Sequence, residues 1–335
     1  MSPIKKHILI IRPSAIGDII ITLPTLHALR NHIPNSHIEI MGYPSYLELV
    51  HGRFYADTIS RFDHPDISIL LRKDARIPDS LRERFSKFDL IIAFIADRDK
   101  IFSENLQASG AKEVLCYNPF PNDSKPIHII DHFLNSLKLL EIPYSNTTPN
   151  IYLNKEDLIE RENILRNSLE NTRQKRIAIH PGSGSTHKCW LLSNYFSIIQ
   201  WLTEHHNAKI FIIAGPADIV VKQEIDKLPK NNICAIDTPP LTKLAAILQQ
   251  CDLFIGNDSG ITHLAAAMGV STLAIFGPTD PKVWGPRGKS VKICYHPTPC
   301  SPCSDEKRKN CFPKTCLESI TTKMIKEEIL RFLSL

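Results

Sequence analysis

Three short segments of the chain gather the residue types that bind anions or move protons. They are residues 12–18 (RPSAIGD), 180–190 (HPGSGSTHKCW) and 251–288, which open with CDLFIGNDSGITHLAAAMG. Each contains glycine or serine together with a charged side chain. Small residues let the backbone approach a phosphate closely, while charged ones neutralise it or accept a proton. The chemistry of the chain is therefore expected at these three segments.

The third segment has the pattern of strand, turn, helix and strand. Its polar turn GNDSG suits helix capping, and a helix N-terminus after a parallel strand offers free N–H groups and partial positive charge. An ordinary strand–helix–strand unit is the alternative. Polar residues at the carboxyl end of a strand favour a binding site, with four candidates: Asp258, Ser259, Gly260 and His263. A structural role for His263 is equally compatible with the sequence.

The second segment also lies between a predicted strand and a predicted helix. Ser183, Gly184 and Ser185 would let backbone amides reach a phosphate, and Lys188 would add a full positive charge. The segment matches neither the GxxxxGK[ST] phosphate loop nor the GxGxxG dinucleotide fingerprint. Taken alone, it is equally compatible with a flexible connecting loop.

The first segment joins the first predicted strand to the first predicted helix. Asp18 lies in the opening turn of that helix, where a carboxylate complements the helix dipole. On the residues alone, this structural role is the preferred interpretation of Asp18. Arg12 is a candidate contact for a phosphate or an acceptor, and an ordinary surface arginine is the alternative.

These segments are positioned by strands and helices that alternate along the chain, which predicts an α/β protein with doubly wound parallel sheets. The predicted strands of the first half are residues 6–11, 37–41, 89–94 and 113–117, and its helices are 44–51, 80–87 and 128–140. The predicted strands of the second half are 176–180, 209–214, 232–236, 252–255, 272–276 and 291–295, and its helices are 192–205 and 241–250.

A change in composition between the halves predicts two domains. Residues 1–150 form the first domain, and 151–175 form a connection with a charged helix over 155–171. Residues 176–318 form the second domain, and 319–335 a C-terminal helix whose apolar stripe packs on protein. Two such domains facing each other would leave a cleft between strand ends for a ligand.

Composition limits the function classes. The 335 residues are 43% hydrophobic and 22% charged, as in soluble globular proteins. A net charge of +5 is compatible with an anionic substrate or a membrane surface, but it is too weak to indicate nucleic acid. Because no apolar run approaches the length of a membrane span or a signal peptide, a cytoplasmic protein is expected.

Four of the nine cysteines form a cluster near the C-terminus. Their spacing is Cys300-x2-Cys303-x7-Cys311-x4-Cys316, amid polar residues. In a reducing compartment this density suggests a structural site in which four thiolates hold zinc or iron. The second pair is irregularly spaced, and free thiols or disulfides are an equal alternative.

The three segments together resemble glycosyltransferase family 9, the ADP-heptose:lipopolysaccharide heptosyltransferases. The resemblance is carried by IGD after the first strand, HPGSGS…K-x-W in mid-chain, and NDSGITHLAAAMGV…AIFGPTDP…WGPRG near the end. It implies the GT-B fold, in which two Rossmann-like domains face each other across a cleft. It also implies an acceptor held mainly by the N-terminal domain and a nucleotide-sugar donor held mainly by the C-terminal domain. Heptose would be transferred with inversion and without a catalytic metal.

The resemblance also implies residue roles. Asp18 corresponds to the proposed general base, and Lys188 to the lysine that stabilises the leaving diphosphate. Arg12 and Ser14 would contact the acceptor. The donor-binding residues would be Ser183, Gly184, Ser185, Asp258, Ser259, Gly260 and His263. The implied partners are ADP-heptose, the lipid-linked lipopolysaccharide core and, transiently, the inner face of the inner membrane.

Two departures from the family pattern bear on the acceptor. Ala15 stands where many members carry a second hydroxyl, and KCWL replaces the common K-x-W-P. Transfer of another sugar, or transfer to a protein, therefore stays open. Further alternatives are a sugar-nucleotide epimerase of similar fold, a non-catalytic nucleotide-sugar binding protein and an NAD-dependent oxidoreductase; the missing GxGxxG argues against the last.

Overall fold

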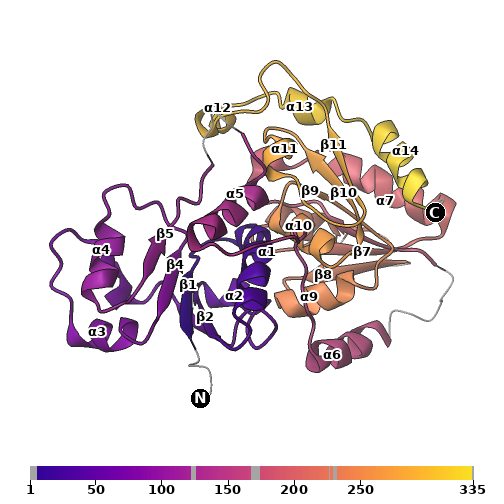
Figure 1. Cartoon of the computed structure of the whole chain (residues 1–335). Coiled ribbons are helices and arrows are strands. Elements are labelled where there is room, and N and C mark those ends of the chain that lie inside the picture. Colours follow the sequence, from indigo (N-terminus) through magenta and orange to yellow (C-terminus); the bar gives the residue numbers. More distant parts are fainter. Residues whose placement is uncertain (1–5, 122–125, 167–173, 226, 229–231, 334–335) are drawn as a thin grey trace. The chain divides into compact units, whose positions relative to one another are not determined.

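The computed structural model describes residues 6–121, 126–166, 174–225, 227–228 and 232–333, and it divides into two compact units (Figure 1). Unit 1 comprises residues 1–147 and unit 2 comprises 148–335. Each unit has a parallel sheet of its own, with five strands in the first and six in the second.

Unit 1 is built on a sheet of order β3-β2-β1-β4-β5. Its strands are β1 (His7–Ile11), β2 (His37–Gly42), β3 (Thr58–Arg61), β4 (Leu90–Ala93) and β5 (Val114–Cys116). The central strands are almost continuously apolar because both of their faces are covered, as is usual for parallel sheets. Ile8 and Ile10 face one side while Leu9 and Ile11 face the other, and all four are at most 1% exposed.

Helices cover both faces of this sheet, with α1, α2 and α5 on one side and α3 and α4 on the other (Figure 1). The helical segments are α1 (Ile16–His32), α2 (Pro44–Leu47), η1 (Pro65–Leu71), α3 (Asp79–Phe85), α4 (Ile101–Ala108), α5 (Ile129–Asn135) and η2 (Ser136–Leu140), the η segments being 3₁₀ helices. Helix α1 continues through Pro24 and buries Ile19, Leu23, Leu26 and Leu29.

Unit 2 has a sheet of order β11-β10-β9-β6-β7-β8. Its strands are β6 (Arg176–His180), β7 (Lys209–Ala214), β8 (Ile233–Asp237), β9 (Leu253–Asn257), β10 (Ser271–Phe276) and β11 (Val291–Tyr295). Its helical segments are α6 (Lys155–Arg166), η3 (Thr186–Lys188), α7 (Leu192–His206), α8 (Ile219–Ile225), α9 (Leu241–Leu248), α10 (Gly260–Ala267), α11 (Pro281–Trp284), α12 (Asp305–Lys309), α13 (Thr315–Glu318) and α14 (Thr322–Leu333).

Each sheet has one topological switch point, where the chain stops adding strands on one side and begins on the other. In unit 1 this point lies between β1 and β4, and in unit 2 it lies between β6 and β9. Ligands of open α/β sheets bind beside the carboxyl ends of strands at such a point. The predicted site residues of the three segments lie after the ends of β1, β6 and β9.

The doubly wound α/β class predicted from the sequence is confirmed, and most predicted elements are present within one to three residues of their predicted ends. The elements that the sequence did not predict include the edge strand β3 and the short helices α4 and α8. The predicted helix 44–51 ends at Leu47, and the part of helix 155–171 beyond 166 lies outside the described residues. These elements are short or lie at edges, where periodicity carries little signal.

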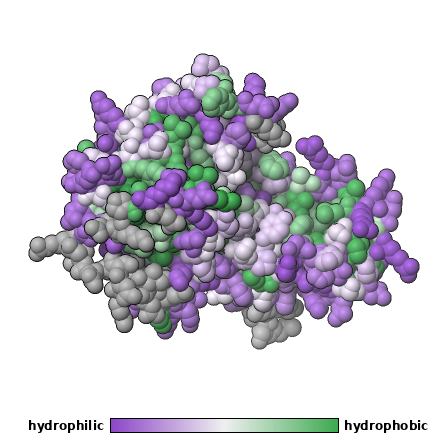
Figure 2. Space-filling model, turned by 180° about the vertical axis from the view of Figure 1, so that it is seen from behind, coloured by the Kyte–Doolittle hydropathy of each residue, from purple (hydrophilic) through white to green (hydrophobic). Residues whose placement is uncertain are grey.

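Polar side chains cover much of the face seen in Figure 2, with apolar side chains showing in patches between them. None of the described helices is long and apolar enough to cross a membrane.

Candidate active site

The turn after β1 places three predicted residues at the switch point of unit 1. The N–H of Arg12 donates to the carbonyl of Met41 (2.8 Å), which extends the pairing of β1 with β2 by one residue. Helix α1 then begins at Ile16, and its N-cap residue, Ala15, makes no side-chain capping bond. Asp18 lies in the first turn of α1, where its negative charge complements the free N–H groups.

Arg12 and Asp18 form an ion pair at this turn. Their closest atoms, Nη2 of Arg12 and Oδ1 of Asp18, are 3.3 Å apart, and the side chains are 6% and 38% exposed. The guanidinium also lies over the ring of Phe133 in α5, 4.7 Å from its centroid. Burial lowers the pKa of Arg12 to about 10, although the Asp18 charge opposes this shift. Asp18 therefore keeps access to solvent while its cation is enclosed.

Two buried polar atoms at the same turn have no hydrogen-bond partner among the described residues. They are Nε of Arg12 and the hydroxyl of Ser14. A buried donor without a partner costs about 1–3 kcal/mol, so native proteins seldom keep one without a reason. Oxygen atoms of a bound ligand would satisfy both groups.

Strands β6 and β9 bring the other two segments together at the switch point of unit 2. They pair directly, with His180 opposite Gly256. Asn257 is fully buried and connects the two turns. Its Oδ1 accepts from the N–H of Trp190 (3.0 Å), and its Nδ2 donates to the carbonyl of Pro181 (2.6 Å). One amide side chain thus fixes both ends of segment 180–190 against β9.

Asp258 gathers polar contacts from three segments. Its backbone carbonyl accepts from the hydroxyl of Ser183 (2.7 Å). Its Oδ2 lies 2.8 Å from Nζ of Lys188, and the same atom accepts from the hydroxyl of Thr279 (2.5 Å). The Asp258 side chain is 7% exposed and that of Lys188 is 25% exposed. The predicted phosphate-binding lysine therefore has a buried carboxylate as its counter-ion.

Helix α10 starts immediately after this pair. Ser259 is its N-cap, and the Ser259 hydroxyl accepts from the N–H of Thr262 (3.3 Å). Gly256, near the end of β9, is required because a Cβ there would lie 2.8 Å from the ring of Phe254. Gly260 is the first residue of the helix, and His263 is buried on it. The structure therefore presents the helix start expected for anion binding beside Lys188.

Beneath the same turns lies a buried histidine–carboxylate pair that was not predicted from the sequence. Nε2 of His180 is 3.2 Å from Oδ2 of Asp218, and its Nδ1 is 3.3 Å from the Ser259 hydroxyl. Burial alone would raise the pKa of Asp218, but hydrogen bonds from His180 and the N–H of Gly215 outweigh burial and lower it. Gly182 is needed here, since a Cβ would collide with the Asp218 carboxylate.

Segment 180–190 is therefore an ordered turn, and not the flexible connecting loop that the sequence also allowed. Ser183 and Lys188 are both fixed to Asp258. Ser185 is the N-cap of the 3₁₀ turn η3, and its backbone carbonyl accepts from the N–H of Lys188 (3.0 Å). Gly184 faces open space, with no atom within 4 Å of a Cβ placed on it. Backbone between these residues is therefore accessible to a ligand.

A model of glycosyltransferase family 9 (heptosyltransferase) matches residues 122–312, more than half of the chain. The chain belongs to glycosyltransferase family 9. It is therefore a glycosyltransferase of the heptosyltransferase family.

Relatives of this family 9 chain resemble it over nearly the whole length. A lipooligosaccharide heptosyltransferase 2 from Campylobacter jejuni is 25% identical over 95% of this chain and 96% of the relative. The solved structure of the ADP-heptose lipopolysaccharide heptosyltransferase II of E. coli superposes with a TM-score of 0.76 at 16% identity, covering 98% of both chains. The fold is accordingly GT-B, as the resemblance implied.

An iron-containing glycosyltransferase is among the solved structures that share this fold. The dodecameric iron-containing glycosyltransferase TibC of enterotoxigenic E. coli superposes with a TM-score of 0.61 at 12% identity, covering 99% of this chain and 80% of TibC. At that identity the comparison supports only the shared fold. Whether this chain's own residues suit a metal depends on the arrangement of its thiols.

The four thiols lie close enough to influence one another. Burial raises the pKa of Cys303 and Cys316, and the neighbouring thiols add to both shifts. However, Cys303 Sγ donates to the carbonyl of Cys300 (2.9 Å), and Cys316 is 4% exposed within the core. Across the described ranges, no group of three or more His, Cys, Asp or Glu side chains is arranged to hold a metal. The structural zinc or iron site of four cysteines stays a prediction from the sequence, and no reaction step is assigned to it.

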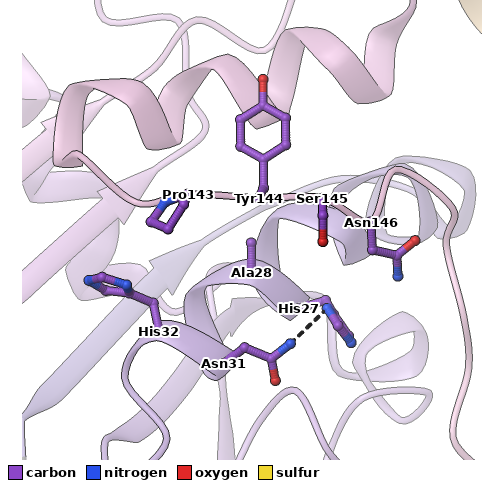
Figure 3. Close-up of a pocket in the computed structure, with 8 residues that line it drawn as sticks. All are labelled: His27, Ala28, Asn31, His32, Pro143, Tyr144, Ser145 and Asn146. Carbon is purple, nitrogen blue, oxygen red and sulfur yellow. Dashed lines mark hydrogen bonds between the residues drawn. The ribbon is translucent and has the colours of Figure 1, made fainter.

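A separate pocket of unit 1 contains none of the predicted site residues. It measures about 240 Å³ and lies between the last turns of α1 and residues 143–146 (Figure 3). His27 and Asn31, which interact within α1 (3.2 Å), line one side. Asp18 is at the opposite end of this 17-residue helix, so the pocket is distinct from the switch point.

Proposed function

We propose that this family 9 chain transfers heptose from ADP-heptose to the inner core of a lipopolysaccharide or lipooligosaccharide. The proposal rests chiefly on one observation, namely that Lys188, Ser183 and the start of α10 converge on Asp258 at the switch point of unit 2. This arrangement suits a diphosphate, and the full-length similarity to heptosyltransferases supports heptose as the sugar.

In the proposed reaction unit 2 binds the donor. Lys188 and the N–H groups at the start of α10 stabilise the negative charge that grows on the diphosphate as the bond to heptose breaks. Ser183, Gly184 and Ser185 provide the close backbone approach, while Ser259, Gly260 and His263 complete the donor turn. This charge is met by the protein's own cations and dipoles, so we propose catalysis without a metal cofactor.

Unit 1 supplies the base and the acceptor contacts. Asp18 takes the proton from the acceptor hydroxyl as the hydroxyl oxygen attacks the anomeric carbon of heptose. The new C–O bond forms on the face opposite the departing ADP, which inverts the anomeric configuration. Arg12 Nε and the Ser14 hydroxyl, which lack partners among the described atoms, would bind oxygen atoms of the acceptor. The acceptor would be met at the cytoplasmic face of the inner membrane.

Acceptor-dependent release of ADP is the direct test. The protein is incubated with ADP-heptose, with and without a heptose-deficient lipopolysaccharide. Release of ADP only with the acceptor, together with a heptose-sized mass increase of the lipopolysaccharide, is expected. Conversion of the sugar nucleotide without acceptor would instead identify an epimerase. Binding of ADP-heptose with no conversion in either case would identify a binding protein.

A further inference from the structure

The loop after β10 holds a buried threonine whose role the proposed reaction leaves open. Thr279 is 9% exposed, and its hydroxyl donates to Oδ2 of Asp258 (2.5 Å). The next residue, Asp280, caps helix α11 by accepting the N–H of Lys282 (2.9 Å). Thr279 therefore sits in a short, ordered connection between β10 and α11 and points its hydroxyl at the donor turn.

Several contacts hold this loop in place. A Cβ on Gly277 would lie 2.5 Å from Cγ of Leu317, so the loop packs closely on α13. The carbonyl of Pro278 accepts from the N–H of Cys303 (2.7 Å). Because its surroundings are fixed, the Thr279 hydroxyl is a positioned donor.

Two groups share one oxygen of Asp258. Oδ2 carries both the Thr279 hydroxyl and the ammonium of Lys188, on a side chain that is 7% exposed. If Lys188 turns to a diphosphate, the carboxylate loses its counter-ion in a largely dry site. A buried charge left without a partner is strongly unfavourable, so the transfer of Lys188 depends on what still stabilises Asp258.

We propose that Thr279 is a positioning residue. It allows the ammonium of Lys188 to leave the Asp258 carboxylate and to bind the diphosphate of the donor. Before the donor binds, the Thr279 hydroxyl shares Oδ2 of Asp258 with Lys188 and so weakens the ion pair between Asp258 and Lys188. After the ammonium leaves, the same hydroxyl keeps Asp258 hydrogen-bonded and oriented. Both effects favour the diphosphate-bound state. This inference rests on the proposed function, since it takes a nucleoside diphosphate as the ligand of Lys188.

The test compares nucleotide binding by calorimetry in T279V, T279S and the control T272V. Valine keeps the shape of threonine without its hydroxyl, and serine keeps the hydroxyl. Thr272, also in unit 2 and fully buried, donates to the carbonyl of Val270 (2.8 Å) at the other end of β10. T272V therefore removes a comparable buried hydrogen bond away from Asp258.

We expect T279V to weaken ADP binding about tenfold or more, as for the loss of a hydrogen bond to a charged group. Adenosine, which has no phosphate, should bind T279V and wild type equally. T279S should recover most of the ADP affinity, and T272V should leave it unchanged. A parallel loss for ADP and adenosine would mean that Thr279 supports the fold of unit 2 generally and would overturn the inference.

Wild-type ADP affinity in T279V would also overturn the inference. If T279V does not fold, T279A is measured against T279S with the same two ligands, and the same outcomes decide. Failure of the proposed function is recognised separately, because the wild-type protein would then release no ADP in the presence of acceptor.

Discussion

The two switch points differ in how far their polar groups are satisfied within the chain. Of the five buried side-chain N or O atoms without a partner among the described residues, two lie in the β1 turn, Arg12 Nε and Ser14 Oγ. One, Nδ1 of His187, lies in segment 180–190 of unit 2. In contrast, Ser183 and Lys188 are each bonded to Asp258.

This difference indicates two kinds of site. In the proposed donor turn of unit 2, Lys188 is paired with Asp258, and segment 180–190 is held by Asn257. The β1 turn of unit 1 instead keeps two buried polar atoms, Arg12 Nε and Ser14 Oγ, that have no partner among the described residues and that the proposed acceptor would bond. Variants in each turn test this difference.

The largest effect is expected for Asp18→Asn. A positioned general base contributes about 10²–10⁴-fold, so kcat should fall at least 100-fold. The matched control is Asp79→Asn, because Asp79 is also an acid in the first turn of a helix, α3, but is not predicted in the site. If kcat falls equally in Asp18→Asn and Asp79→Asn, the role of Asp18 is limited to stabilising the start of its helix.

Lys188→Met should lower kcat/KM by about 10²-fold, since one donor to the developing charge is lost. The control is Lys222→Met in α8, which breaks another lysine–aspartate pair of unit 2, with Asp237 (2.6 Å). Steady-state kinetics with varied ADP-heptose give kcat/KM for both variants, and only Lys188→Met should show the loss. If Lys188→Met keeps the wild-type kcat/KM, Lys188 does not stabilise the leaving diphosphate, and its proposed role is wrong.

Arg12→Met should reduce kcat about tenfold without lowering the melting temperature. Asp18 is 38% exposed and can be hydrated alone, while replacing a buried cation by an apolar side chain is often neutral or stabilising. Arg12→Lys should recover part of the activity, since lysine restores the charge without the guanidinium geometry. A drop in melting temperature that parallels the loss of activity would instead indicate a structural ion pair.

The smallest effects separate two serines. The Ser14 hydroxyl has no partner among the described residues, so Ser14→Ala should not destabilise the protein, while the KM for acceptor rises. The Ser183 hydroxyl donates to the carbonyl of Asp258 (2.7 Å), so Ser183→Ala should cost about 1 kcal/mol of unfolding free energy. Denaturant unfolding and acceptor titration test both. Equal stability losses would remove the contrast between the units.

The fold was predictable because the central strands are continuous apolar runs and their helices have clear stripes. The segments at both switch points could be found for the same reason, since each follows a central strand. The partners of these residues could not be found. Nothing in the sequence pairs Lys188 with Asp258 across 70 positions.

Residues that act through buried hydrogen bonds also escaped prediction. Asn257 was seen only as a turn residue, although its side chain holds segment 180–190 in place. Thr279 lies in the quoted motif GPTDP, but its hydroxyl reaches Asp258 only because β10 pairs with β9. His180 and Asp218 are 38 residues apart and meet because β6 and β7 are neighbours. Such pairings depend on strand order, which local patterns do not encode.

The division of labour between the units is tested most directly by titrating ADP-heptose into Asp18→Asn and Lys188→Met in the absence of acceptor. We predict that Asp18→Asn binds the donor with wild-type affinity although its turnover is lost, whereas Lys188→Met binds it at least about tenfold more weakly. Loss of donor binding in Asp18→Asn, or wild-type binding in Lys188→Met, would contradict this division.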